Sequence, residues 1–283
     1  MWNRTTKIVA VAAALVVLAA VGIWAWASVQ REPLPLADRC VATVAGSTAT
    51  VDPDQAYYAG LISGVSVKRG LVPRAASIAL ATAFQESNLH NLDYGHSDSI
   101  GLFQQRPSQG WGTVEEIMDP WYSTTAFYKA LVKVKNWEKG DINDIAQAVQ
   151  RSGFPEAYRQ HVDRARLLAS ALAGETPAAF SCKIASPGTP DADGMTTFLT
   201  KTFGKKVSVK ADGTRLVVTA DDVQTAWSVA HSAVAGVQRY GIAAVEVGAW
   251  TWTHDKGSLA AWHGTGKPDA KVAVLTFPAE TPR

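Results

Sequence analysis

A glutamate at the end of an apolar helical stretch is the side chain best placed to do chemistry. Positions 79, 83 and 86 fall on one line of an α-helix, so Glu86 continues a face that carries Ala79 and Ala83. A carboxyl group at the edge of an apolar face loses water, and this loss raises its pKa. A general acid needs a raised pKa in order to protonate a leaving oxygen near neutral pH. The spacing makes Glu86 a candidate general acid; the alternative at this stage is a solvated or ion-paired glutamate near a helix end.

A second motif follows the glutamate after a polar loop that contains glycine. The segment Gly101-Leu102-Phe103-Gln104 is suited to form the far wall of a groove. The planar amide of Gln104 can hydrogen-bond both hydroxyl and acetamido groups. Asp93 and Asp98 lie in the loop, and each is either a second carboxylate of the site or the side chain of an Asx turn. Asp98 is favoured of the two, because it directly precedes Ser99 and the Gly-Leu-Phe-Gln segment.

The two motifs resemble those of the soluble lytic transglycosylase and goose-type lysozyme superfamily. Its hallmark is a Glu-Ser pair that ends a helix, here Glu86-Ser87, followed by a Gly-Leu-Met-Gln-like segment. The continuation through residues 105–112 is similar to that of exported lysozyme-like proteins of Gram-positive bacteria. The resemblance covers roughly residues 40–182 and implies a peptidoglycan-cleaving enzyme. In such an enzyme Glu86 would protonate the oxygen of the β-1,4 bond between N-acetylmuramic acid (MurNAc) and N-acetylglucosamine (GlcNAc). The residues expected to contact the glycan strand are Ser87, Ser99, Phe103, Gln104, Gln150 and Tyr158.

One departure from the family pattern leaves the reaction product open. Lytic transglycosylases often carry Ala-Tyr-Asn-Ala-Gly late in the domain, whereas this chain reads Ala148-Val149-Gln150-Arg151-Ser152 and lacks the tyrosine. In one route, the neighbouring acetamido group of the sugar assists the cleavage, and the sugar's own hydroxyl then closes a 1,6-anhydro ring. Hydrolysis with inversion would need Asp93 or Asp98 at roughly 6.5–9.5 Å from the acid. The alternative is that the protein no longer cleaves peptidoglycan and instead binds the wall as a scaffold protein of the cell envelope.

Helical patterns dominate the region around these motifs. Pro73 suits the first position of the helix that carries Glu86. Asp119-Pro120 and Asp141 or Asn143 have the chemistry of helix starts, and Pro155 is expected to open a long last helix. Residues 40–185 are therefore expected to form an α-rich, lysozyme-like domain.

A change of pattern follows a linker at residues 186–194. Short β-branched runs at 207–209, 216–218, 245–247 and 272–275 predict strands, and Asp212-Gly213 suits a hairpin turn. Asp221 or Asp222 is expected to cap a helix that ends at Gly241. Residues 195–283 are thus expected to be a small α+β domain, whose role we interpret as contact with an envelope protein.

The N-terminus predicts an exported protein. Residues 1–7 are basic and are followed by an apolar run at 8–27, long enough to span a bilayer, and by a stalk at 28–39. This pattern predicts a single-pass membrane protein with a cytoplasmic tail and extracytoplasmic domains. The alternative is a signal peptide and secretion. The complete fold class expected is an α-rich lysozyme-like domain followed by a small α+β domain, after an N-terminal transmembrane helix.

Export affects how the two cysteines are interpreted. Outside the membrane, Cys40 and Cys182 are expected to form a disulfide that closes the region between them. The formal net charge of +2 is too small to indicate nucleic-acid binding. His90, Asp93 and His96 match no ligand spacing, so we expect no metal ion and no other cofactor. The expected partners are peptidoglycan glycan strands and, through residues 8–27, the cell membrane.

Overall fold

The computed structural model describes residues 37–279, which combine helices with two antiparallel sheets in a mixed α/β fold. The residues from Asp38 onward belong to one compact unit. The expected fold class, an α-rich domain with a small α+β domain appended to it, was therefore wrong. Strands flank the helices of the first half, and the second half contributes a six-stranded sheet.

The expected cytoplasmic tail at residues 1–7, the membrane span at 8–27 and most of the stalk at 28–39 lie outside the described residues. Within residues 37–279, no helix combines the length and the apolar character needed to cross a bilayer.

Among the described residues, two short strands precede the first helix and a third follows the helix at Val162–Leu172, and together they form a sheet in the order β2-β1-β3. These strands are β1 (Arg39–Val44), β2 (Ser47–Val51) and β3 (Phe180–Lys183). Ala45 and Gly46, which join β1 to β2, both have positive φ, as a tight hairpin turn requires. The strands have four to six residues each, and the sequence analysis did not predict them.

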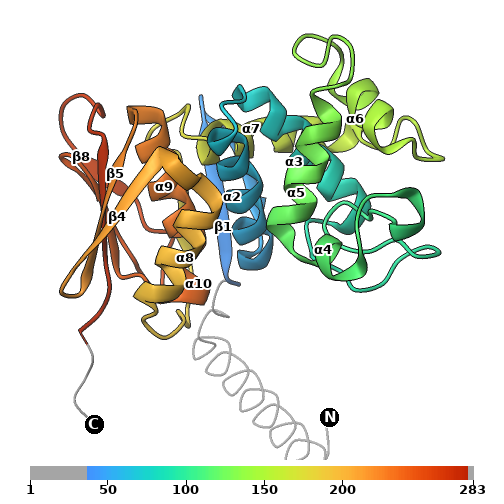
Figure 1. The fold of residues 1–283 in the computed structure, drawn as a ribbon. Helices are drawn as coiled ribbons and strands as arrows, with labels where there is room; N and C mark the ends of the chain where they lie inside the picture. The colour runs from blue at the N-terminus through green and yellow to red at the C-terminus, as the bar shows by residue number, and fades with distance from the viewer. Residues whose placement is uncertain (1–36, 280–283) are drawn as a thin grey trace, which may run out of the picture. The chain divides into compact units, whose positions relative to one another are not determined.

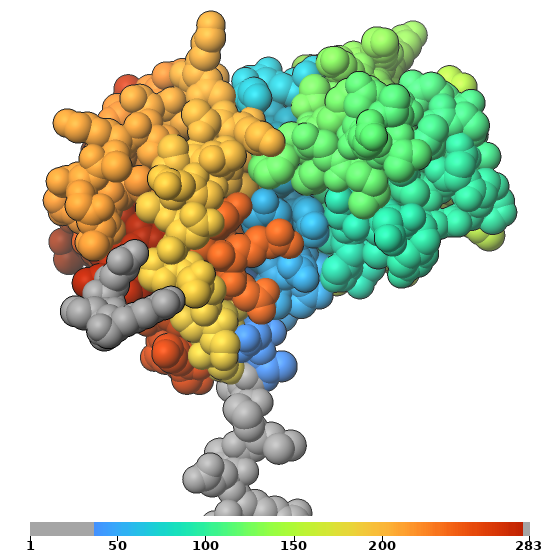
Figure 2. All heavy atoms as spheres, turned by 60° about the horizontal axis from the view of Figure 1, so that its bottom comes forward, coloured from blue at the N-terminus to red at the C-terminus, as the bar shows by residue number. Residues whose placement is uncertain are grey.

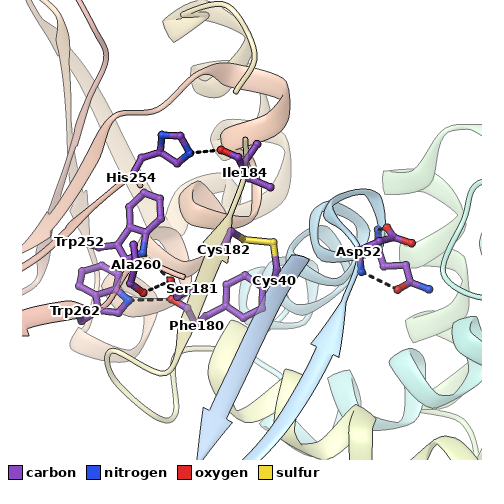
Figure 3. Close-up of a disulfide and its surroundings, with 11 residues drawn as sticks. Cys40, Asp52, Phe180, Ser181, Cys182, Ile184, Trp252, His254, Ala260 and Trp262 are labelled. Carbon is purple, nitrogen blue, oxygen red and sulfur yellow. Dashed lines mark hydrogen bonds between the residues drawn. A yellow bond between two sulfur atoms is a disulfide. The ribbon is translucent and has the colours of Figure 1, made fainter. Parts of the chain in front are cut away.

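The expected disulfide is confirmed. Cys40 of β1 and Cys182 of β3 face each other in register and are bonded, both fully buried (Figure 3). The bond joins positions separated by 142 residues. In the chain-entropy model, closing so long a loop stabilises the fold by about 4–5 kcal/mol.

The outer edge of β3 is tied to the six-stranded sheet by side chains (Figure 3). Indole and imidazole N–H groups from residues 250–264 donate to this edge: Trp252 to Ser181 Oγ at 2.9 Å, Trp262 to the Phe180 carbonyl at 2.9 Å and His254 to the Ile184 carbonyl at 2.8 Å. The two sheets are therefore joined through β3, which is one physical reason why the two halves of the chain form one unit.

The six-stranded sheet has the order β4-β5-β9-β6-β7-β8. Its strands are β4 (Val207–Asp212), β5 (Arg215–Ala220), β6 (Ala244–Val247), β7 (Trp250–Thr253), β8 (Trp262–Gly264) and β9 (Val272–Thr276). The four strands predicted from β-branched runs are confirmed as β4, β5, β6 and β9. The predicted hairpin turn is also confirmed, since Gly213 has a φ of 60° between β4 and β5.

The α-helices are α2 (Pro53–Lys68), α3 (Pro73–Ser87), α4 (Val114–Met118), α5 (Pro120–Leu131), α6 (Ile142–Gln150), α7 (Val162–Leu172), α8 (Ala192–Phe203), α9 (Val223–Ala235) and α10 (Val237–Tyr240). Short 3-10 helices are η1 (Pro107–Gln109), η2 (Arg159–His161) and η3 (Gly204–Lys206).

Helix α2 lies at the centre of the fold. Most of its residues are buried, as expected for a helix that other elements surround. It packs against α3 and α5 on one side and against α8 and α9 on the other (Figure 1). Figure 2 shows the same arrangement from another direction, with the segment that contains α2 between the α4–α5 region and the C-terminal part.

Several local predictions for the helices are confirmed. Pro73 is the first residue of α3, and Asp119, Asp141 and Asp222 accept backbone N–H groups at the starts of α5, α6 and α9. The prediction at Pro155 was wrong, because a proline suits a turn as well as a helix start. The chain forms turns before η2, and α7 begins only at Val162.

The segment predicted as a linker, residues 186–194, is held against the body of the protein. Its backbone N–H groups at Gly188 and Asp191 donate to the carbonyls of Val237 and Tyr240, at 3.3 and 3.1 Å. Helix α8 already begins at Ala192, within this segment.

Candidate active site

Helix α3 ends abruptly just after Glu86. Asn88 and Leu89 both take the left-handed conformation, with φ of 51° and 61°, and the Leu89 N–H donates to the Ala83 carbonyl at 3.0 Å. A left-handed leucine is strained, but this one is fully buried, so its burial offsets the strain. The carboxyl group of Glu86 is thereby fixed at the end of a rigid helix.

Glu86 lines a cavity of about 400 Å³. Its side chain is partly buried, and it is the only carboxylate among the described residues that line the cavity. The other lining residues are His96, Ser99, Gln104, Gln105, Arg106, Gln109, Trp111, Gln150, Arg151, Ser152, Gly153 and Phe154. They come from the loop after α3, from the end of α6 and from the loop after α6.

The nearest partner of the glutamate is a tyrosine. The Tyr158 hydroxyl donates a hydrogen bond of 2.6 Å to Glu86 Oε1. Tyr158 is fully buried, so it cannot stack on a sugar ring as the sequence analysis expected. It lies just before η2, and the turns that replace the expected helix start at Pro155 bring it to the acid.

The electrostatics of Glu86 agree with the sequence-based hypothesis of a raised pKa. Burial raises the pKa of the Glu86 carboxyl, while hydrogen bonds from Tyr158 and Gln150 oppose the rise. Burial, together with the nearby Glu86 charge, raises the pKa of Tyr158, so its hydroxyl stays a neutral donor. Burial therefore shifts Glu86 toward its protonated form relative to an exposed glutamate, while the two hydrogen bonds stabilise its carboxylate.

Two glutamines expected at the site do line the cavity. The Gln150 amide donates to the Phe103 carbonyl at 2.7 Å, which ties α6 to the Gly-Leu-Phe-Gln segment. Gln104 has a φ of 46°, and its amide donates to the Tyr94 carbonyl at 3.2 Å. Gly95 permits this arrangement, because a Cβ at that position would overlap Gln104 Oε1 and the Ser99 carbonyl.

The side chains of Ser87 and Phe103 pack inside the protein and do not line the cavity. Ser87 is buried and donates to the Leu102 carbonyl at 2.7 Å, so it fixes α3 to the Gly-Leu-Phe-Gln segment and does not orient Glu86. Phe103 is fully buried and stacks on Phe127 with ring centroids 4.6 Å apart. Neither side chain is available to a glycan. Ser99, by contrast, lines the cavity as expected.

The two loop aspartates do not line the cavity. Asp98 accepts hydrogen bonds from Arg106 Nε at 2.6 Å, the Ser108 N–H at 2.8 Å and Ser108 Oγ at 3.0 Å. The Arg106 interaction, followed by those with Ser108, holds the pKa of Asp98 well below its usual range. Asp93 is exposed. Arg106 and Ser108 therefore hold Asp98 within the loop, and neither aspartate is among the residues that line the cavity.

The sequence analysis missed several residues of the cavity. Phe154 is the most notable, because its side chain is 75% exposed at the cavity. Arg151 adds positive charge to the walls, whereas the charge of Arg106 is paired with Asp98. Their only signal in the sequence was position: Arg106 follows the Gly-Leu-Phe-Gln segment, and the other two flank a Ser-Gly pair typical of a turn.

In comparisons with known proteins, no family model matches the chain, and no curated protein matches it.

Glu86→Gln is expected to stabilise the protein at neutral pH. The folded state holds the glutamate with a raised pKa, so folding favours the protonated form and loses stability as the pH rises through that pKa. Glutamine has no charge to desolvate and can still accept the Tyr158 hydroxyl. Urea unfolding of both proteins near pH 7 and near pH 4.5 measures the effect. The gain should be larger near pH 7, and equal stabilities at both pH values would contradict it.

Proposed function

We propose that this protein cleaves the β-1,4 bond between MurNAc and GlcNAc in peptidoglycan, with Glu86 as the general acid. The observation that carries the proposal is a half-buried carboxyl group, raised in pKa, that faces a cavity and is held by a tyrosine hydroxyl. A structural glutamate on a helix is normally solvated or paired with a cation, and Glu86 has no cationic partner in the described structure.

The walls of the cavity suit a sugar. Amides at Gln104 and Gln150 and the hydroxyl of Ser99 offer both donors and acceptors to hydroxyl and acetamido groups. Phe154 and Trp111 offer apolar faces. This mixture of planar amides and aromatic rings supports a carbohydrate as the ligand.

The proposed reaction begins with a proton on Glu86 Oε2, since Oε1 already accepts the Tyr158 hydroxyl. This proton moves to the glycosidic oxygen as the C1–O bond of MurNAc breaks. The carbonyl oxygen of that sugar's own acetamido group bonds to C1 and takes the place of a protein nucleophile. Hydrogen bonds from Tyr158 and Gln150 stabilise the new carboxylate.

The second step returns the proton to the glutamate. The Glu86 carboxylate takes the proton of the MurNAc 6-hydroxyl as that oxygen attacks C1 and displaces the acetamido oxygen. A 1,6-anhydro ring forms, and Glu86 is protonated again. Acetamido assistance is favoured over inversion by water, because the cavity has no second carboxylate among its described residues.

The tyrosine at the acid also bears on the alternative of a non-cleaving scaffold protein. The chain lacks the tyrosine of the Ala-Tyr-Asn-Ala-Gly pattern, but Tyr158 offers a phenol to Glu86 from a different segment. This contact favours an enzyme over a scaffold. The proposal includes an extracytoplasmic location, because the Cys40–Cys182 disulfide is typical of oxidising compartments.

Glu86→Gln is expected to abolish clearing of purified peptidoglycan in a zymogram, with a fall in rate of at least about 100-fold. The reason is that an amide has no proton of suitable acidity to transfer. Glu138→Gln, at an exposed position outside the cavity, is the matched control and should keep full activity. Equal activity of the Glu86→Gln variant and the wild-type protein would refute the proposed function.

Tyr158→Phe is expected to shift the alkaline limb of the pH–rate profile to higher pH. In the wild type, the hydrogen bond from Tyr158 lowers the pKa of Glu86. Without this hydrogen bond, the pKa of Glu86 rises further. The rate at the optimum should fall about 10- to 100-fold, because the forming carboxylate loses a charged hydrogen bond worth about 1.5–3 kcal/mol. Tyr128→Phe removes a buried hydroxyl that donates to the Ile62 carbonyl instead, and it should leave the profile in place.

The products are expected to carry 1,6-anhydro-MurNAc ends. Mass spectrometry of digested wall distinguishes them from reducing ends, since the anhydro form is lighter by one water. Digests with reducing MurNAc ends would contradict the acetamido route and would require a base that activates water.

A further inference from the structure

The cavity at Glu86 continues into a longer groove. A second cavity of about 570 Å³ shares Gln109, Trp111, Gln150 and Arg151 with the Glu86 cavity. A third cavity of about 230 Å³ shares Trp111, Ala130 and Lys133 with the second. Trp111 lines all three and is partly buried, so it forms a common wall. We call the second and third cavities together the distal groove.

The distal groove is positively charged. Arg151, Lys133 and Lys129 line it, and no described residue that lines either of its cavities is acidic. Lys129 lies in the last turn of α5, and Lys133 follows just after the helix ends. Both lysines are exposed, and neither forms an ion pair with a described residue.

The two lysines bring two positive charges together at the C-terminal end of α5, where the helix dipole also favours cations. They are four residues apart around the end of one helix, and like charges at this spacing repel each other. The other residues that line the third cavity, Gly110, Tyr122, Thr125 and Ala126, offer no countercharge. An anionic ligand would relieve the repulsion.

We propose that the distal groove binds the carboxylates of a peptide stem on the glycan strand. The inference rests on the proposed function, which places the glycan at Glu86. In peptidoglycan the stem is attached through the lactyl ether of MurNAc, so a strand seated at Glu86 carries carboxylates beside its sugar chain. Trp111 contacts the sugar or the lactyl group, and Lys129 and Lys133 pair with the stem carboxylates. The groove thereby selects strands that still carry their peptides.

Binding by the full-length Glu86→Gln protein tests this assignment without cleavage of the probe. The probes are a peptidoglycan tetrasaccharide with its stem peptides and the same tetrasaccharide after an amidase has removed them and the exposed lactyl carboxylates have been capped as methylamides. Isothermal titration at low and at physiological salt gives the Kd of each. The peptide-bearing probe should bind about 3- to 10-fold more tightly, and salt should reduce the difference.

The decisive comparison is the double substitution Lys129→Gln and Lys133→Gln, made in the same background. It should abolish the preference for the peptide-bearing probe and leave the Kd of the peptide-free probe unchanged. Lys135→Gln with Lys139→Gln removes the same charge from exposed residues that do not line the groove, and it should keep the preference.

Three results would overturn the assignment. They are equal affinity for the two probes, a preference that survives the Lys129 and Lys133 substitutions, and equally tight, lysine-dependent binding of a poly(glycerol phosphate) chain. The last result would make the groove a general polyanion site.

A wild-type protein that cleaves wall but shows no preference refutes only this inference. A lysine-dependent preference in a protein that never cleaves refutes only the proposed function.

Discussion

The hydrogen bond between the Tyr158 hydroxyl and the Glu86 carboxyl is the interaction on which the candidate site depends. Partial burial alone would raise the pKa of Glu86 and leave its carboxylate without a hydrogen-bond donor to stabilise the charge. The phenol, itself a neutral donor, makes both protonation states accessible. An acid that must give up a proton and later recover it requires this balance. The contact also joins α3 to the segment before η2, so the Glu86 carboxyl is held from two directions.

The rest of the fold keeps these two elements in position. Helix α3 packs against α7, α6 and α2, and α2 packs in turn against α9, which covers the six-stranded sheet. The disulfide fixes β1 to β3, and the edge of β3 is tied to β7, β8 and the loop between them by indole and imidazole groups. The C-terminal sheet is therefore part of the framework that supports the helices around the cavity. This explains why the two halves form one compact unit.

Local chemistry in the sequence was sufficient to predict many of these features. Three kinds of local pattern act within a few residues and can therefore be recognised in the sequence. They are the alanines that share a helix face with Glu86, the capping aspartates at 119 and 141, and the β-branched runs of the second half. The role of Tyr158 could not be predicted from the sequence, because its contact with Glu86 spans 72 positions and depends on turns that replaced an expected helix. The pairing of Asp98 with Arg106 was likewise not predicted, since Arg106 comes from the far side of the Gly-Leu-Phe-Gln segment.

The titration of Glu86 tests the central claim most directly. Carbon-13 NMR of the wild-type protein, labelled at glutamate side-chain carboxyls and assigned with Glu86→Gln, reports the pKa of this group without relying on activity. The account predicts a midpoint clearly above that of the exposed glutamates in the same spectrum, because burial outweighs the two hydrogen bonds. A midpoint equal to theirs or below it would contradict the account, since a carboxyl group ionised at neutral pH has no proton to give to a glycosidic oxygen.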